Sequence, residues 1–121
     1  MQHHNGTDII EIERIRQAIT RFGDRFLNRV YTEAELNIYG HHAHSLAASF
    51  ASKEAVMKVL GTGNRGVAWR EIEVLFHKTG KPYIRLNGRA KKVADKLGIK
   101  EIDVSMSHSR ENAIAMAVGS T

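Results

Sequence analysis

The segment from Phe50 to Gly63, FASKEAVMKVLGTG, constrains the fold of this chain more than any other stretch. Its pattern predicts the end of a long helix that closes on a glycine-rich stop. Glu54 and Lys58 are four residues apart, so their side chains leave one face of this helix about 5–6 Å from each other. The same face continues back through Ala51 and Ala47, which are too small to fill the space beside the pair. We therefore expect a recess in which a ligand can approach the backbone.

A carboxylate and an ammonium group in such a recess can together hold a divalent cation and a phosphate oxygen. The alternative is a solvated ion pair worth about 0.3–0.5 kcal/mol, and the segment by itself favours that alternative. The loop that follows, Gly61 to Gly66, has bare backbone amides that can face an anion. A helix C-cap and a turn explain the same glycines more simply, and the order of Gly, Lys and Thr differs from that of a Walker loop.

The chain has the size and composition of one globular domain, residues 1–121, with 42% hydrophobic and 26% charged residues. A core of this size leaves little room for a deep cavity within one subunit, so we expect a sizeable ligand to bind near an edge or between subunits. The absence of cysteine excludes disulfides and thiolate metal sites. Because no apolar run approaches the roughly 20 residues of a membrane span and residues 1–15 lack a signal-peptide core, we expect a cytoplasmic protein.

The net charge of +5 indicates an anionic partner or ligand: nucleic acid, a membrane surface, a phosphorylated small molecule or an acidic protein. Basic residues gather on two predicted helices, Glu11 to Arg21 and Asp24 to Val30, which Gly23 separates. Four arginines recur there at intervals of seven, four and four residues: Arg14, Arg21, Arg25 and Arg29. A solvated helix face is one explanation of this arginine stripe. Because only two acids, Glu13 and Asp24, lie among these arginines, we favour a docking surface for an acidic partner.

The rest of the pattern predicts an α+β fold, a small and mostly antiparallel sheet with helices packed on it. The other expected elements are a strand (Gly6 to Ile12), two helices (Thr32 to Tyr39 and Ser45 to Leu60), a hairpin (Trp69 to Phe76 and Tyr83 to Leu86), a helix (Gly88 to Leu97) and a closing hairpin (Glu101 to Ser107 and Asn112 to Val118). Thr32 and Glu35 form a capping box, and Ser45 is the expected N-cap of the long helix. The last two helices are expected to bury Leu46, Phe50, Met57 and Leu60, and Ala90, Val93, Ala94 and Leu97.

Three further features carry groups that can do chemistry. Asp8 lies inside a run of strand-forming residues, where an acidic residue is uncommon in a core. Either it lies at the exposed edge of the strand, or it binds a ligand. His108 stands at the end of a strand beside two serines, which suits a phosphate contact or an acid/base group as well as a structural histidine. The sequence HHAH places three histidines at 41, 42 and 44, but no nearby cysteine or acid completes a zinc-site spacing, so we disfavour a metal site there.

These motifs together resemble the holo-acyl-carrier-protein synthases, which are 4'-phosphopantetheinyl transferases of a small trimeric bacterial type. The resemblance rests on GTDI around Asp8, the KEA-x-x-K-x-x-GTG core at 53–63, GKP at 80–82 and SMSHS at 105–109, in the same order and at similar separations. It extends from Gly6 to Val118 and includes RFLNRVYTEAEL at 25–36.

The resemblance implies transfer of the phosphopantetheine arm of coenzyme A to a serine of apo acyl carrier protein, with release of adenosine 3',5'-bisphosphate, in fatty acid biosynthesis. Asp8 and Glu54 correspond to the carboxylate ligands of Mg²⁺, and Lys58 to the group on the pyrophosphate. Three further sets of residues take their roles from the same resemblance: His108 and Gly63 at the coenzyme A phosphates; Gly80, Lys81 and Pro82 at its adenine-ribose end; and Arg14, Arg21, Arg25 and Arg29 on the acidic carrier protein. The family's homotrimer implies active sites at subunit interfaces.

Two positions depart from the family pattern. Ser49 stands where relatives commonly carry arginine, so one phosphate or partner contact is missing unless Arg65 or Arg70 supplies it. The N-terminal HHNGTDI lacks a second glycine that relatives often show. Two other functions therefore stay open: a non-enzymatic basic module that binds nucleic acid or coenzyme A, and a family member that binds coenzyme A without transferring from it. The sequence contains no recognisable nucleic-acid motif and no apolar run long enough to span a membrane. For the transferase, which we favour, we therefore expect neither nucleic acid nor membrane as a partner.

Overall fold

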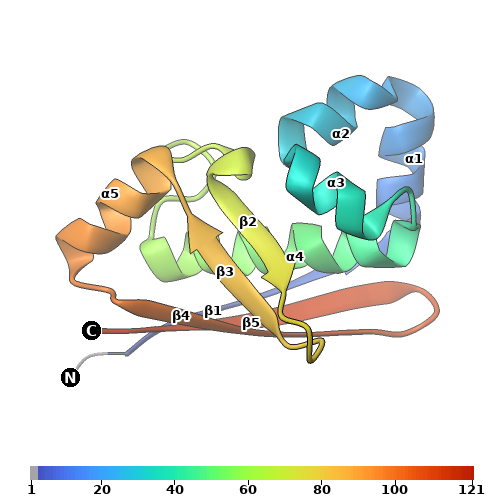
Figure 1. Ribbon diagram of the computed structural model, residues 1–121. Helices are drawn as coiled ribbons and strands as arrows, with labels where there is room; N and C mark the ends of the chain where they lie inside the picture. Colours follow the sequence, from blue (N-terminus) through green and yellow to red (C-terminus); the bar gives the residue numbers. More distant parts are fainter. Residues whose placement is uncertain (1–2) are drawn as a thin grey trace.

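The computed structural model describes residues 3–121, which form five helices, five strands and one 3-10 turn (Figure 1). The elements in chain order are β1 (His3–Glu11), α1 (Ile12–Phe22), α2 (Asp24–Val30), α3 (Glu33–Tyr39), α4 (Ala43–Leu60), the 3-10 turn (Trp69–Glu71), β2 (Ile72–Phe76), β3 (Pro82–Leu86), α5 (Gly88–Leu97), β4 (Glu101–His108) and β5 (Asn112–Ser120). Within these residues no helix is both long enough and apolar enough to cross a bilayer. The predicted α+β class is confirmed.

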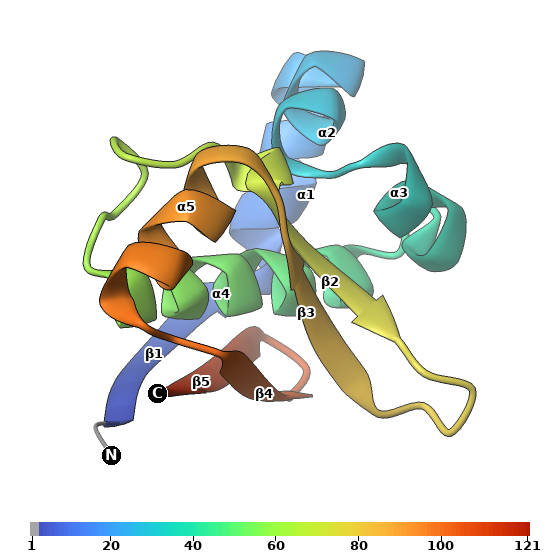
Figure 2. The ribbon, with the colours of Figure 1, turned by 60° about the vertical axis from the view of Figure 1, so that its left-hand side comes forward.

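The strands form two antiparallel sheets instead of one. A three-stranded sheet has the order β1-β5-β4, with Asp8 opposite Ala115 and Ser105 opposite Met116. A separate two-stranded sheet pairs β2 with β3. Helix α4 lies across the three-stranded sheet, and α1, α2, α3 and the β2–β3 hairpin lie on its other side (Figures 1 and 2). The central helix therefore has protein around most of its circumference.

This central position changes the interpretation of the small residues on α4. Ala47 and Ala51 are fully buried in the same core cluster as the inward-facing alanines of β5, Ala113, Ala115 and Ala117. Gly6 of β1 approaches α4 so closely that an added Cβ would lie 2.3 Å from the carbonyl oxygen of Ala55. The predicted recess beside Ala47 and Ala51 is therefore wrong, because the small side chains make room for the sheet and not for a ligand.

Several predicted boundaries also differ from the structure. Helix α4 begins at Ala43, because the extended residue His42 is its N-cap and accepts the first helical hydrogen bond, from Leu46 N at 2.9 Å. Ser45 is thus inside the first turn and the prediction of a Ser45 cap is wrong. The strand predicted from Trp69 begins only at Ile72, because Trp69–Glu71 is a 3-10 turn. Leu97, which was predicted to be buried, is 40% exposed. The predicted capping box of α3 is confirmed, with Thr32 N donating to a Glu35 carboxylate oxygen at 2.9 Å.

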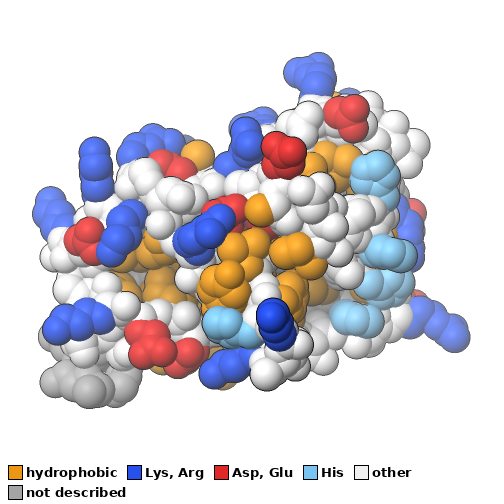
Figure 3. Space-filling model, in the orientation of Figure 1, with side chains coloured by type: hydrophobic (Ala, Val, Ile, Leu, Met, Phe, Trp, Pro, Cys, Tyr) orange, Lys and Arg blue, Asp and Glu red, His pale blue; other side chains and the backbone are white. Residues whose placement is uncertain are grey.

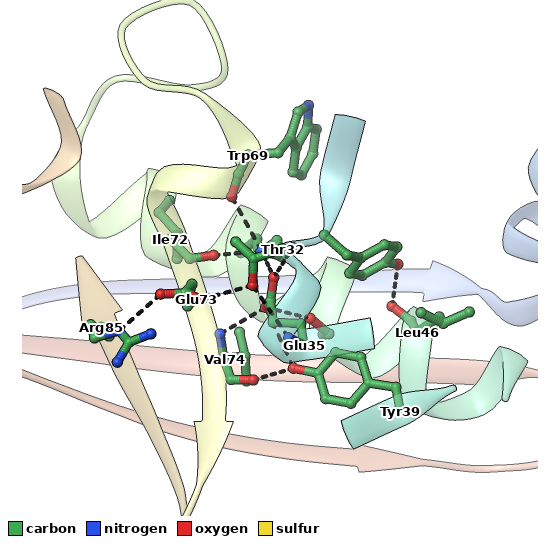
Figure 4. A network of polar contacts seen from close by, with 12 residues as sticks. Thr32, Glu35, Tyr39, Leu46, Trp69, Ile72, Glu73, Val74 and Arg85 are labelled. Carbon is green, nitrogen blue, oxygen red and sulfur yellow. Dashed lines mark hydrogen bonds and ion pairs between the residues drawn. The ribbon is translucent and has the colours of Figure 1, made fainter. Parts of the chain in front are cut away.

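A fully buried ion pair fixes α4 against its neighbours. The Lys53 ammonium donates to Glu35 Oε1 at 2.8 Å, to the carbonyl oxygen of Trp69 at 3.2 Å and to that of Ile72 (Figure 4). Glu35 in turn accepts from Val74 N at 2.8 Å. Both side chains of the pair are 0% exposed. The pair therefore joins α3, α4 and β2 and sets how α4 is rotated, which decides where the neighbouring Glu54 points.

Candidate active site

Asp8 and Glu54, which are far apart in the sequence, line the same hollow. This hollow has a volume of about 330 Å³ and lies between β1, α1 and α4. Arg14 lines it as well, and the rest of its wall is mostly apolar: Ile9, Ile10, Ile15, Ala18, Phe26 and Phe50. The structure thus brings together the two carboxylates that the sequence analysis had singled out. It also places an arginine beside them.

The pKa of Glu54 is raised above its ordinary value, first because the carboxyl group is partly buried and second because Asp8 carries negative charge nearby. Lys58 and Arg14 act in the opposite direction but do not cancel the rise. The positive charge around Glu54 is therefore too small to stabilise its ionised carboxylate fully. A cation between the two carboxylates would relieve that shortage, and hard oxygen donors of this kind are what Mg²⁺ prefers.

Lys58 contacts β1 and not its helical neighbour Glu54. Its ammonium group donates to the carbonyl oxygen of Thr7 at 2.6 Å and lies 3.4 Å from Asp8 Oδ1. Among residues 3–121 no ion pair joins it to Glu54, so the simple surface pair expected from the four-residue spacing is wrong. The reason is that β1 crosses α4 at Gly6, which puts the carboxylate of Asp8 and the carbonyl of Thr7 within reach of the Lys58 side chain.

A second hollow adjoins Glu54 on the side of the glycine loop. It has a volume of about 250 Å³ and is lined by Glu54, Met57, Lys58, Gly63, Asn64 and Trp69. Gly63 has a φ of +58°, a backbone conformation that favours glycine. Glu54 and Lys58 therefore face a concave surface that includes the predicted phosphate-binding loop.

The other predicted ligand-binding residues lie elsewhere on the chain. His108 lines a hollow of about 240 Å³ together with Ser45, Ser49 and Phe76. Lys81 and Pro82 line another, of about 390 Å³, and Gly80 is exposed in the turn before β3. Asp8 and Glu54, His108, and Lys81 with Pro82 thus line three different hollows. Within residues 3–121 of one chain, none of these hollows holds His108 or Lys81 together with Asp8 and Glu54.

Comparison with known proteins settles the family. Residues 5–117 match the model of the 4'-phosphopantetheinyl transferase superfamily. The chain belongs to this superfamily. It is 51% identical to a holo-[acyl-carrier-protein] synthase from Herpetosiphon aurantiacus, with 94% of this chain and 95% of the relative covered. The predicted family is thereby confirmed.

Solved structures of 4'-phosphopantetheinyl transferases superimpose on nearly the whole chain. A holo-[acyl-carrier-protein] synthase from Neisseria meningitidis has a TM-score of 0.90 at 34% identity, covering 98% of both chains. The Helicobacter pylori holo-[acyl-carrier-protein] synthase in complex with coenzyme A has a TM-score of 0.88 at 32% identity, covering 96% of this chain and 99% of that one.

The four arginines of the stripe are all exposed on α1 and α2. Arg14 differs from the others, because it lines the hollow of Asp8 and Glu54 and lies close enough to lower the pKa of Glu54. Sequence spacing grouped it with the docking surface and missed this position. The available signal was its place in the first turn of a helix that directly follows the strand carrying Asp8. Phe22 is 49% exposed, and the guanidinium carbon of Arg21 lies 5.2 Å from the centroid of its ring. This ring adds an apolar contact to the same surface.

Ser49, the position at which the resemblance implied an arginine, is 1% exposed, and its hydroxyl donates to Glu35 Oε2 at 3.5 Å. Both arginines considered as substitutes, Arg65 and Arg70, are exposed, and neither lines the hollow that holds Ser49 and His108. Of the HHAH histidines, His44 lies against His108, with ring centroids 5.1 Å apart. Figure 3 shows several histidine side chains gathered on one side of the molecule. Residues 3–121 contain no group of three or more histidine and acidic side chains arranged to hold a metal ion.

Proposed function

We propose that this protein transfers the 4'-phosphopantetheine group from coenzyme A to a serine of apo acyl carrier protein. The serine oxygen attacks the phosphorus that carries the pantetheine arm, and an oxygen–phosphorus bond forms there. The bond from that phosphorus to the bridging oxygen of the pyrophosphate breaks. Adenosine 3',5'-bisphosphate leaves with the bridging oxygen, and the serine proton is released.

The observation that carries this proposal is the meeting of Asp8 and Glu54 at one hollow, with the Lys58 ammonium group 3.4 Å from Asp8 Oδ1, in a member of the superfamily. Phosphoryl transfer needs little covalent help from a protein and much neutralisation of charge on the phosphates. A relative at 51% identity is named a holo-[acyl-carrier-protein] synthase, and a solved neighbour binds coenzyme A. Both support coenzyme A and acyl carrier protein as the substrates of this chain.

Asp8 and Glu54 fit the role of magnesium ligands. They share one hollow, and the raised pKa of Glu54 reflects a carboxylate in need of a nearby cation. Mg²⁺ typically takes one or two carboxylates and completes its octahedron with water and phosphate oxygens, so two ligands from the protein are enough. When bound, the ion would neutralise charge on the pyrophosphate. Lys58, held at Thr7 and Asp8, offers its ammonium group to the same phosphates.

The remaining residues of the site require more than one chain. His108 and the Gly80–Pro82 turn lie on surfaces away from Asp8, so we propose that a neighbouring subunit brings them to the Asp8 hollow in a homotrimer. The outer face of the three-stranded sheet supports this, because Ile9, Ile114 and Met116 are 62%, 43% and 50% exposed there. Ile9 pairs with Ile114 in register, so the three form one apolar patch. A second copy of the chain would bury that patch.

The arginine stripe is the proposed contact for acyl carrier protein, an acidic partner. Its position on α1 and α2, beside the Asp8 hollow, would place the carrier's serine near the phosphates. We further propose that the reaction serves fatty acid biosynthesis in the cytoplasm. Arg14 is expected to contribute at both the carrier surface and the hollow, whereas Arg21 contributes at the surface alone.

The deciding experiment is the mass of an apo acyl carrier protein after incubation with this protein, coenzyme A and Mg²⁺. We expect the carrier to gain one phosphopantetheine group, and the gain to disappear in Glu54→Gln and Asp8→Asn while both variants stay folded. Asp95→Asn, at an exposed carboxylate on α5, is the matched control and should be as active as wild type. Undiminished activity of Glu54→Gln would remove the metal assignment, and coenzyme A binding without any transfer would favour a non-enzymatic module.

Trimer formation is tested separately by light scattering of the purified protein. Met116→Lys places a charge in the exposed apolar patch without touching the core, so we expect the variant to remain folded and to dissociate. A wild-type protein that is monomeric at micromolar concentration and fully active would contradict the proposal of shared active sites.

A further inference from the structure

One of the HHAH histidines contacts His108. The ring centroids of His44 and His108 are 5.1 Å apart, and the ring planes are inclined at 59°. His44 comes from the first turn of α4, and His108 is the last residue of β4. Such tilted arrangements at this separation are attractive for aromatic rings. The tertiary structure therefore gives one histidine of the sequence HHAH a specific neighbour.

The two rings rest on supports of different rigidity. Just beyond His44, the carbonyl oxygen of Leu46 accepts a hydrogen bond of 2.6 Å from the buried hydroxyl of Tyr31, and Leu46 is fully buried. The start of α4 is thus firmly attached to the core. His108, in contrast, is exposed and precedes the turn that leads into β5. Without a neighbour, an exposed histidine side chain samples several rotamers, so a ring on the rigid helix limits that sampling.

We propose that His44 is a positioning residue, whose ring holds the ring of His108 in the orientation that contacts a phosphate of coenzyme A. This inference rests on the proposed function, in which His108 makes that contact. His44 acts through His108 and does not itself touch the substrate. The exposed residues His41 and His42 make no ring contact with His108, so the role belongs to one member of the histidine sequence.

The test compares two replacements of His44 in the full-length protein. His44→Phe keeps an aromatic ring but removes the ring nitrogens, whereas His44→Ala removes the ring. We expect His44→Ala to raise the KM for coenzyme A about 3- to 10-fold with kcat nearly unchanged, which corresponds to about 0.7–1.4 kcal/mol. We expect His44→Phe to stay within about twofold of wild type, as should the matched control His41→Ala.

A second readout does not depend on turnover. The imidazole carbon-bound proton resonances of His108 in the NMR spectrum should shift in His44→Ala, while the amide spectrum of the core stays unchanged. A structural defect would instead move many core resonances together. In His44→Phe the His108 resonances should also differ from those in His44→Ala, because the ring contact remains.

His108→Ala separates the two levels of the proposal. If it raises the KM for coenzyme A but His44→Ala does not, the positioning role of His44 is overturned and the proposed function stands. If an active enzyme shows no change in KM with His108→Ala, the assignment of His108 is wrong and the positioning role is overturned with it. A His44→Phe variant as impaired as His44→Ala would also overturn positioning by the ring, since the nitrogens would then be required.

Discussion

Removal of the buried ammonium group of Lys53, on α4, should cost this protein a large part of its stability. The replacement is Lys53→Met, which keeps a long unbranched side chain and deletes the ammonium group. That group is 0% exposed and lies 2.8 Å from Glu35 Oε1. Because a buried carboxylate would then lack its counterion, the expected loss is about 3–5 kcal/mol. Glu35 keeps hydrogen bonds from Thr32 N and Val74 N, so the lower end, about 3 kcal/mol, is our expectation.

Burial is what makes this ion pair costly to break, and the chain offers a matched control. Lys91 and Asp95 form a pair of almost the same length, 2.7 Å, but each side chain is 59% exposed. Lys91→Met should therefore cost only about 0.3–0.5 kcal/mol. A loss of about 3 kcal/mol at Lys53 corresponds to a fall in Tm of roughly 10–15 °C for a chain of this size.

The assay is urea unfolding followed by tryptophan fluorescence, with Tm measured by calorimetry. All variants are compared at one protomer concentration, because self-association would stabilise the folded state. In the double variant Lys53→Met/Glu35→Gln the buried charge is removed together with its partner, and we expect it to recover at least 1 kcal/mol relative to Lys53→Met. Equal losses for Lys53→Met and Lys91→Met would refute the reasoning.

Three further predictions concern the site. Gly6→Ala should lower the free energy of unfolding by about 1–3 kcal/mol, measured by urea unfolding, because the new Cβ would meet the carbonyl oxygen of Ala55 at 2.3 Å. Glu54→Gln should flatten the pH dependence of stability in the absence of metal. The raised pKa of Glu54 means that the unfolded carboxyl group loses its proton first, so wild-type stability falls relative to the variant as pH rises above the ordinary value of 4.5. Urea midpoints of both proteins at pH 4 and pH 7 test the sign. A wild type that becomes more stable relative to Glu54→Gln between pH 4 and pH 7 would contradict the prediction. Arg21→Glu should raise the KM for acyl carrier protein and weaken its salt dependence, leaving the KM for coenzyme A nearly unchanged in steady-state assays; an equal rise in both would argue against a docking role.

Much of the local structure followed from short-range patterns in the sequence. Thr32 and Glu35 are three residues apart, and the capping box depends on that spacing alone. Gly23, Gly40, Gly61 and Gly98 end helices because they adopt positive φ angles there. The motifs around Asp8 and Glu54 were likewise sufficient to identify the family. These features could be predicted because they depend on residues close together in the chain or on an ordered set of motifs.

What each face of α4 contacts was decided only by tertiary structure. The sequence placed Glu54 and Lys58 on one face, but the crossing of β1 at Gly6 pairs Lys58 with Asp8 and Thr7. Ala47 and Ala51 are buried in the same core cluster as the alanines of β5, where a recess had been predicted. Arg14 and His44 acquire their positions in the same way, from packing between distant segments. Periodicity determines which side chains share a face, whereas long-range packing determines the surface that this face meets, because no local pattern records how two distant elements cross.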